Sequence, residues 1–199
     1  MIEQKNRCFW CGEDELMIKY HDEEFGMPTF DDHKQFEHLS LEVLQCGLNW
    51  RYVIHKRKIF RNCLDNFDFE KISQYNESDI ERIMQFEGML RSRRKIAALI
   101  NNAKCFIKIR EEFGSFSNYI WSYVDNVPLL YSSHNENNLP AKNELSERIA
   151  KDLKIRGFKY VGAVTIYSHL QGVGIINDHF KNCFRREEII SKYPPKVID

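Results

Sequence analysis

Apolar side chains recur at the spacing of an α-helix along most of the chain. Such stripes cover residues 36–44, 80–84, 96–107 and 145–153, and glycines at both ends predict a further helix over about 162–172. Asp31 and Asp32 precede the first stripe as possible caps, and Ser78 opens a capping-box sequence before the second. No segment alternates with the period of two that marks a strand, and the asparagine-rich residues 132–140 are typical of a loop. The pattern predicts an all-α fold without a parallel sheet.

The length of 199 residues fits one large domain or two small lobes. We expect a single domain over residues 1–199, built as two helical lobes with both termini in one of them. Residues 1–6 are polar and show no secretory signal, and the most apolar stretch, 160–176, contains three glycines and several polar residues. We therefore expect a soluble, cytoplasmic monomer.

Charge is balanced overall but unevenly placed. The net formal charge is zero, which argues against an indiscriminate binder of polyanions. Basic residues nevertheless gather at 91–95 and 151–162, and acidic residues at 13–15 and 22–24. This separation favours a small nucleic-acid footprint, although solvated helix faces give the same pattern.

Two cysteines and two histidines near the chain ends form a possible metal site. Cys8 and His21 lie near the start, and His179 and Cys183 near the end. On a helix, side chains four residues apart project from one face, as two ligands of one metal must. Two thiolates and two imidazoles make the closed tetrahedral set of a structural zinc. From spacing alone, Cys11 is a rival ligand because it forms a C-x-x-C pair with Cys8, and an incidental arrangement stays open.

Aromatic residues are dense around one acid. Trp10, Tyr20, Phe25 and Trp50 flank the segment that contains Glu42. On a helical wheel Glu42 lies well off the apolar stripe of residues 36–44, so the wheel alone predicts a solvated glutamate.

Residues 153–165 read as a helix, a glycine-containing hairpin and a second helix that opens at Gly162. This is the layout of a helix-hairpin-helix, in which backbone N–H groups at the second helix can hold a DNA phosphate. An ordinary helical turn gives the same pattern.

Together these features resemble the 3-methyladenine DNA glycosylase I family. The matching segments are RCFWCGEDELMIKYHDEEFG from Arg7, SLEVLQCGLNW from Ser40, FEGMLRSRRKI from Phe86, LKIRGFKYVGAVTIYSHLQGVGIINDH from Leu153 and HFKNC from His179. The resemblance implies the helix-hairpin-helix DNA glycosylase fold, with a zinc site joining the N- and C-terminal segments. It also implies base-excision repair: hydrolysis of the N-glycosidic bond of 3-methyladenine in alkylated double-stranded DNA, with free 3-methyladenine as product.

The resemblance assigns one structural Zn²⁺ to Cys8, His21, His179 and Cys183, and leaves Cys11 as a bystander. It makes Glu42 the acid that recognises the base and the one catalytic side chain.

Further roles follow from the same resemblance. Trp10, Tyr20 and Trp50 should line the base pocket with Glu42, and Leu48 should plug the gap left by the extruded nucleotide. DNA should contact the basic stretch 91–95 and the hairpin, through Arg156, Gly157, Lys159 and Gly162.

Two positions predict an enzyme without lyase activity. Val164 stands where lyases of the wider superfamily have a lysine nucleophile, and Asn177 where the superfamily has an aspartate. Met17, Phe25 and Asn49 depart from the usual family residues beside the pocket. Alternative interpretations are a weak or inactive relative that only binds damaged DNA, and a zinc-stabilised helical protein that binds another protein through its aromatic surface.

Overall fold

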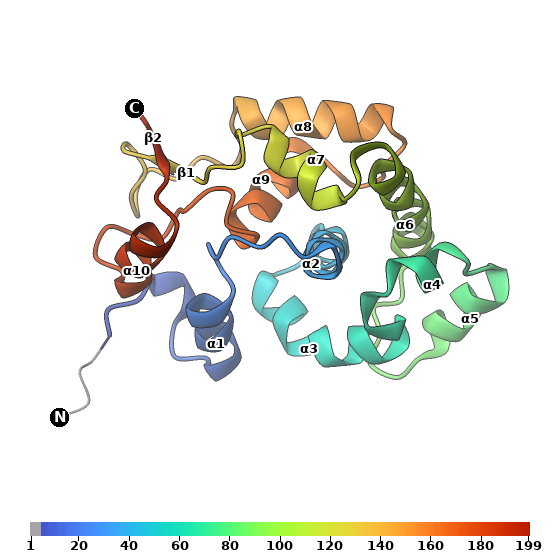
Figure 1. The fold of residues 1–199 in the computed structure, drawn as a ribbon. Coiled ribbons are helices and arrows are strands. Elements are labelled where there is room, and N and C mark those ends of the chain that lie inside the picture. The colour runs from blue at the N-terminus through green and yellow to red at the C-terminus, as the bar shows by residue number, and fades with distance from the viewer. Residues whose placement is uncertain (1–4) are drawn as a thin grey trace.

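The computed structural model describes residues 5–199, which form ten α-helices, two short 3₁₀ helices and two short strands (Figure 1). In chain order the elements are η1 (Phe9–Cys11), α1 (Glu15–Glu23), α2 (Asp32–Gln45), α3 (Trp50–Cys63), η2 (Asp65–Phe67), α4 (Phe69–Ser73), α5 (Glu77–Gln85), α6 (Arg93–Phe113), α7 (Phe116–Ser122), β1 (Leu129–Tyr131), α8 (Glu144–Ile155), α9 (Ala163–Gly172), α10 (Phe184–Lys192) and β2 (Lys196–Ile198). The expected helices over residues 36–44, 96–107, 145–153 and 162–172 are confirmed. No helix of the described residues is long and apolar enough to cross a membrane.

Helix α2 lies at the centre of the molecule (Figure 1). Asp31 caps it, because its carboxylate accepts a hydrogen bond from the backbone N–H of Lys34 at 3.0 Å. Helices α3, α6, α7 and α9 all contact it, so residues 35–44 are buried on every face. The wheel interpretation of Glu42 as a solvated residue is therefore wrong, because the wheel presumes that one face of the helix meets water.

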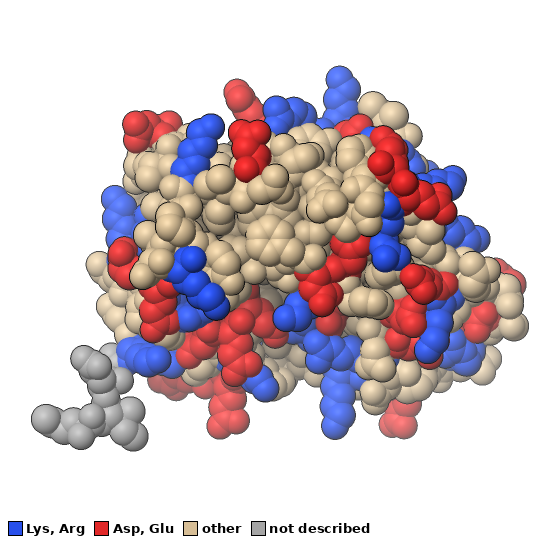
Figure 2. Space-filling view, viewed as in Figure 1, with Lys and Arg blue, Asp and Glu red and all other residues tan. Residues whose placement is uncertain are grey.

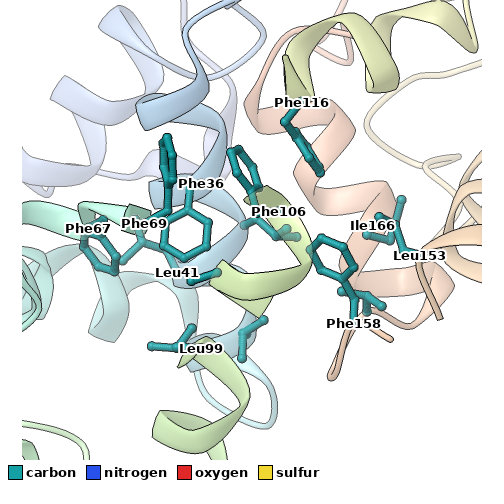
Figure 3. Packing of buried hydrophobic residues seen from close by; sticks show 14 of the residues in the cluster. Phe36, Leu41, Phe67, Phe69, Leu99, Phe106, Phe116, Leu153, Phe158 and Ile166 are labelled. Atoms are coloured by element: carbon teal, nitrogen blue, oxygen red, sulfur yellow. The ribbon is translucent and has the colours of Figure 1, made fainter. Parts of the chain in front are cut away.

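Aromatic rings from four elements form the main core around α2 (Figure 3). Phe36 of α2 packs edge-on against Phe106 of α6 at a centroid distance of 5.2 Å, and Phe106 stacks on Phe116 of α7 at 4.2 Å. Phe69 of α4 closes the group at 4.9 Å from Phe106. Full burial of each ring contributes about 2–3 kcal/mol, so this cluster fixes α2 relative to α4, α6 and α7.

The start of α5 differs from the sequence expectation. Asn76, not Ser78, is the cap: its side chain accepts from the Ser78 N–H at 2.8 Å, and Asp79 accepts from the Asn76 N–H at 3.0 Å. Asparagine is as good a cap as serine, and the reciprocal bond from Asp79 selects it.

Two three-residue strands correct the expectation of a fold without a parallel sheet. β1 and β2 pair in parallel, with Leu129 opposite Lys196 and Tyr131 opposite Ile198. Strands this short show no period-two pattern in the sequence. Their pairing ties the C-terminal segment to the middle of the chain, and the Phe184 N–H donates to the Asn6 carbonyl at 2.9 Å. The N- and C-terminal segments thus lie on the same side of the molecule (Figure 1).

Acidic and basic side chains are interspersed over the face shown in Figure 2. This agrees with the net charge of zero, and no broad basic surface covers that face.

Candidate active site

The structure gathers four buried potential metal ligands from the two ends of the chain. The ligand atoms of Cys8, His21, His179 and Cys183 all lie within 4.8 Å of one another. Cys183 Sγ is 3.3 Å from His21 Nε2 and 3.4 Å from His179 Nδ1, and Cys8 Sγ is 3.6 Å from His179 Nδ1. Tetrahedral zinc with ordinary bond lengths separates its ligand atoms by roughly 3.3–3.8 Å. The cluster therefore has the size of a tetrahedral metal site.

The outer ring nitrogens of both histidines have acceptor partners. His21 Nδ1 lies 2.7 Å from the Asp22 carboxylate, which a paired Arg7 guanidinium holds in place at 2.7 Å. His179 Nε2 lies 2.9 Å from the backbone carbonyl of Phe25. Because each outer nitrogen must donate its proton there, the inner nitrogens keep their lone pairs toward the cluster.

The expectation that His179 and Cys183 share a helix face is wrong. Residues 179–183 form a turn, and Cys183 is the residue that precedes the first turn of α10. The Cys183 N–H donates to the Phe180 carbonyl at 2.9 Å, which closes the turn and brings the two side chains together.

Cys11 is buried but lies outside the cluster. Its thiol donates to the backbone carbonyl of Cys8 at 3.0 Å, an interaction that closes η1. The four-residue set implied by the resemblance is thus the one that the structure brings together, and the C-x-x-C alternative is not.

A cavity of about 470 Å³ lies beside the cluster, between the N-terminal segment and helices α2, α3 and α9. Its walls are Trp10, Met17, Tyr20, Phe25, Glu42, Gln45, Asn49, Trp50, Arg51, Leu139, Ser168, Gln171 and Asp178. The four residues that sequence reasoning assigned to base recognition, Trp10, Tyr20, Glu42 and Trp50, therefore all line one cavity.

Glu42 brings a buried carboxyl group to this cavity. The residue is 4% exposed, and no hydrogen bond among the described residues engages its carboxyl group. Burial without a cationic partner raises the pKa of Glu42 to about 8. A cation or a hydrogen-bond donor that enters the cavity would therefore stabilise this carboxyl group strongly.

The aromatic walls contact one another. The ring of Tyr20 lies 5.4 Å from Trp50 and 6.2 Å from Trp10, and Trp10 lies 5.0 Å from Phe25. The indole N–H of Trp50 is buried and has no hydrogen-bond partner within residues 5–199. An unpaired buried donor is unfavourable, so an acceptor on a bound ligand would satisfy it.

The cavity and the metal cluster share a wall. The Trp10 ring lies 5.3 Å from the His21 ring, and the Phe25 ring lies 5.0 Å from the His179 ring. Fixing the two histidines therefore also fixes two aromatic walls of the cavity.

Residues 156–162 form the hairpin between α8 and α9. Gly157 and Tyr160 have φ angles of 92° and 58°, so the chain turns sharply at both. Asn101 and Asn102 of α6 hold the hairpin: Asn102 accepts from the Lys159 N–H at 2.7 Å and Asn101 donates to the Gly157 carbonyl at 2.8 Å. Sequence reasoning missed both asparagines because they are distant in the chain.

The hairpin leaves the N-terminus of α9 open. Gly162 precedes the helix without a side-chain cap, and Val164 in the first turn is 54% exposed. Backbone N–H groups at such an end suit a phosphate oxygen. Lys159 beside it is exposed.

Several basic side chains expected on the DNA surface are engaged inside the protein. The Arg156 guanidinium pairs with Asp152 at 2.7 Å and Glu112 at 2.6 Å. Lys95 donates to the backbone carbonyls of Leu44 and Cys46, both at 2.7 Å, and so caps the end of α2.

Of the remaining basic residues in this stretch, Arg93 pairs with Glu77 and Glu81, while Arg91 and Arg94 are exposed. Leu48 is half-buried in the turn between α2 and α3, outside the cavity wall.

Comparison with known proteins identifies the family. The sequence model of the methyladenine glycosylase family matches residues 10–186. The chain belongs to this family. DNA-3-methyladenine glycosylase from Haemophilus influenzae and DNA-3-methyladenine glycosylase 1 from Escherichia coli are each 38% identical to it over 177 residues, which is 89% of this chain and 96% and 95% of theirs.

Solved glycosylases of the family share the fold. A crystal structure of 3-methyladenine DNA glycosylase I matches with a TM-score of 0.86 at 40% identity, over 90% of this chain and 98% of that one. The Staphylococcus aureus enzyme, studied for its recognition of 3-methyladenine, matches with a TM-score of 0.86 at 32% identity, over 92% and 97%. A tyrosine-to-phenylalanine variant of the same type of enzyme, in complex with 3-methyladenine, matches with a TM-score of 0.87 at 31% identity, over 91% and 97%.

The three positions that the resemblance marks as departures from the family pattern are cavity residues. Met17, Phe25 and Asn49 all line the cavity, and Met17 is buried there. Asn49 also caps α3, because its side chain accepts from the Arg51 N–H at 2.8 Å.

Asp178 is a charged cavity residue that sequence reasoning missed in this glycosylase. Its carboxylate accepts from the Tyr167 hydroxyl at 2.6 Å and the Gln171 amide at 2.8 Å, and lies 2.8 Å from His134 Nδ1. Asn177, which the resemblance assigns to the superfamily's aspartate position, instead faces the backbone of α10. The aspartate is visible in the sequence, one residue after Asn177 in the same motif.

Proposed function

We propose that this chain removes 3-methyladenine from alkylated DNA by hydrolysing its N-glycosidic bond. The observation that supports this most is the buried carboxyl group of Glu42 in a cavity walled by Trp10, Tyr20 and Trp50. The relatives and neighbours named above are 3-methyladenine glycosylases, and every residue of the cavity wall lies within the matched residues 10–186.

The cavity chemistry suits a cationic base. Methylation at N3 makes adenine in DNA a cation, and a cation over tryptophan or tyrosine rings gains roughly 1–2 kcal/mol when desolvated. The open indole N–H of Trp50 can donate to a ring nitrogen of the base. Because the positive charge already makes the base a good leaving group, the protein need only hold it and admit water to the sugar.

Glu42 provides the selective interaction. In the empty cavity its pKa of about 8 keeps the carboxyl group mostly protonated at pH 7. A cationic base nearby favours the carboxylate, so binding releases a proton and forms a charge-assisted hydrogen bond. Neutral adenine offers no such gain.

Duplex DNA would be held mainly through its backbone. The open N-terminus of α9 and the exposed Lys159 lie at the hairpin, where phosphate oxygens can bind. The target base must leave the stack to enter the cavity. Leu48, in the turn that Lys95 supports, would fill the gap that the base leaves. We propose that one chain acts alone, with the cavity lying between two helical lobes.

The four-residue cluster fits Zn²⁺. Its donor set, its size and the partners of both outer ring nitrogens match a structural zinc site. With four protein ligands no position is open for a catalytic water. The ion would therefore join the chain ends and hold Trp10 and Phe25 in the cavity wall.

The function is tested by incubating the protein with methylated duplex DNA and measuring free bases by chromatography. We expect release of 3-methyladenine by the wild type. Glu42→Gln, which keeps the size, should lower the rate about a hundredfold or more, in the range of a lost charged contact at a reacting centre. Glu87→Gln, an exposed glutamate outside the cavity, is the matched control. Binding of methylated DNA without base release would favour the inactive relative.

A further inference from the structure

Behind Tyr20, a line of buried side chains runs away from the cavity. The Tyr20 hydroxyl lies 3.1 Å from His38 Nε2, and His38 Nδ1 lies 3.2 Å from His169 Nδ1. His169 Nε2 lies 3.0 Å from the Gln35 side-chain oxygen, and the Gln35 amide nitrogen lies 2.9 Å from the Thr29 carbonyl. Five groups from three helices and a loop thus form one hydrogen-bonded relay, of which only Tyr20 lines the cavity.

The backbone carbonyl at the far end sets the direction of every bond in this relay. A carbonyl oxygen can only accept, and that of Thr29 also accepts from the Trp121 indole at 3.0 Å. Gln35 must therefore point its NH₂ group at Thr29 and its oxygen at His169.

The same reasoning fixes which nitrogen of each histidine ring has the proton. His169 must donate from Nε2 to Gln35, so in the neutral ring its Nδ1 is an acceptor. His38 must then donate from Nδ1 to His169, which makes His38 Nε2 an acceptor. The proton of the Tyr20 hydroxyl is the only one that can fill the last bond.

Both rings are in surroundings that keep them neutral. His169 is fully buried and His38 is 6% exposed. Burial, with the Arg57 charge nearby, lowers the pKa of His38 to about 3. Gly172 leaves the space that the His38 ring occupies, because a Cβ there would lie 1.9 Å from its Nε2.

We propose that His38 is a positioning residue that commits the Tyr20 hydroxyl proton to the relay and leaves Tyr20 only lone pairs to offer a base in the cavity. This rests on the proposed role of Tyr20 in base binding. A pocket of this polarity favours a base with an N–H donor, such as the exocyclic amine of 3-methyladenine. It disfavours one of the same shape with a carbonyl there, because two acceptors would then face each other.

The direction of the relay is tested in the wild type without any ligand. Nitrogen-15 NMR of histidine-labelled protein reports which ring nitrogen has the proton. We expect a proton on Nδ1 of His38 and on Nε2 of His169 at neutral pH, with the signals assigned from His38→Gln and His169→Gln proteins. A proton on Nε2 of His38 would overturn the proposal.

The consequence for the cavity is tested with two free bases. 3-Methyladenine and 3-methylhypoxanthine share a shape and differ in an amino or a carbonyl group at one position. The wild type should bind 3-methyladenine more tightly than 3-methylhypoxanthine. We expect His38→Phe, which lacks an acceptor, to lower this ratio of affinities about tenfold, the value of one mismatched hydrogen bond. His38→Gln should preserve the ratio within about threefold, because its amide can donate to His169 and accept from Tyr20.

A merely structural role of His38 would weaken both bases equally and leave the ratio unchanged. In a Tyr20→Phe background, His38→Phe should have no further effect on the ratio. If the wild type binds and excises 3-methyladenine but the ratio is unchanged in His38→Phe, the inference about His38 is wrong and the proposed function stands. Failure of the wild type to bind or excise 3-methyladenine would instead refute the proposed function, and the NMR result would still decide the relay.

Discussion

Asp178 and His179 are adjacent in the chain, yet their side chains serve different sites. The carboxylate of Asp178 lines the cavity and accepts from Tyr167 at 2.6 Å. The Nδ1 atom of His179 belongs to the four-ligand cluster, 3.4 Å from Cys183 Sγ. A metal bound at the cluster would therefore restrain a residue of the cavity wall through a single peptide link.

We predict one zinc per chain, bound through Cys8 and not through Cys11. Cys8→Ser should lose the metal and unfold at lower temperature, because one tetrahedral ligand is gone. Cys11→Ser should keep the metal, since the Cys11 thiol only donates to the Cys8 carbonyl. Elemental analysis of the purified proteins measures both, and zinc-free wild type prepared without chelators would contradict the assignment.

We predict that Asp178→Asn separates the two sites. The variant should keep its zinc but lose stability by roughly 1–3 kcal/mol, because three groups lose an ionised acceptor. Base excision should fall as the cavity wall relaxes. Cys183→Ser, in contrast, should lose zinc and excision together. Metal content, denaturant unfolding and base release are measured on both proteins, and loss of zinc from Asp178→Asn would refute the separation.

Burial of Glu42 should make stability depend on pH. Its pKa rises from an ordinary 4.5 to about 8 on folding, so between these values the folded protein binds more protons than the unfolded one. This contribution is fully present below pH 4.5 and is lost as the pH rises through 8, by as much as roughly 4–5 kcal/mol. Glu42→Gln should therefore stabilise the protein more at pH 9 than at pH 5. Denaturant unfolding of both proteins at the two pH values measures this, and an equal difference at both would contradict it.

The same carboxyl group should make excision rise with pH. Only the carboxylate pairs with a cationic base, so the rate at low substrate should increase up to about pH 8 and then level. In Glu42→Gln this rise should disappear. A pH–rate profile of both proteins on methylated DNA provides the comparison, and the same rise in the variant would assign it to another group.

Much of the fold followed from sequence because the apolar stripes of α2, α6 and α8 are regular and glycines mark both ends of α9. The wheel failed at Glu42 because α2 is packed on all sides, which depends on neighbours and not on its own period. The strands β1 and β2 were missed because three residues give no period.

The site was predicted less completely than the fold, because its residues meet from distant parts of the chain and leave no local pattern. From spacing alone Cys8 and Cys11 stayed rival partners of Cys183, and only the resemblance selected Cys8, since nothing local in either segment indicates the other. His38 and His169 meet across 131 positions of sequence, so neither pattern nor spacing indicated their contact. Arg156 and Lys95 look like DNA contacts in sequence, but Glu112, one partner of Arg156, and Leu44, one acceptor of Lys95, lie 44 and 51 positions away in the chain.

Basic residues at the hairpin should divide into two kinds. We expect Lys159→Ala, and Arg94→Ala in the basic stretch, to change the slope of log DNA affinity against log salt concentration. Each should make this slope shallower by about one, since both side chains are exposed and can each pair with one phosphate. Arg156→Ala should leave that slope nearly unchanged but cost roughly 1–2 kcal/mol of stability, because it removes packing on Phe113 and Tyr119. Binding titrations over a range of salt, beside denaturant unfolding, separate the two, and a reduced slope for Arg156→Ala would place it on the DNA surface.

The product on DNA should be an intact abasic site. A lyase needs an amine nucleophile that forms a Schiff base with the sugar. Val164 stands where such a lysine is expected by resemblance, and among residues 5–199 no lysine lines the cavity, where Arg51 is the basic residue. Arginine stays protonated and cannot serve, so water must capture the sugar and the strand stays whole. Borohydride treatment of the reaction, with a lysine-dependent glycosylase in parallel, tests this on a gel. A covalent protein–DNA band, or strand breaks that appear before heating with alkali, would refute it.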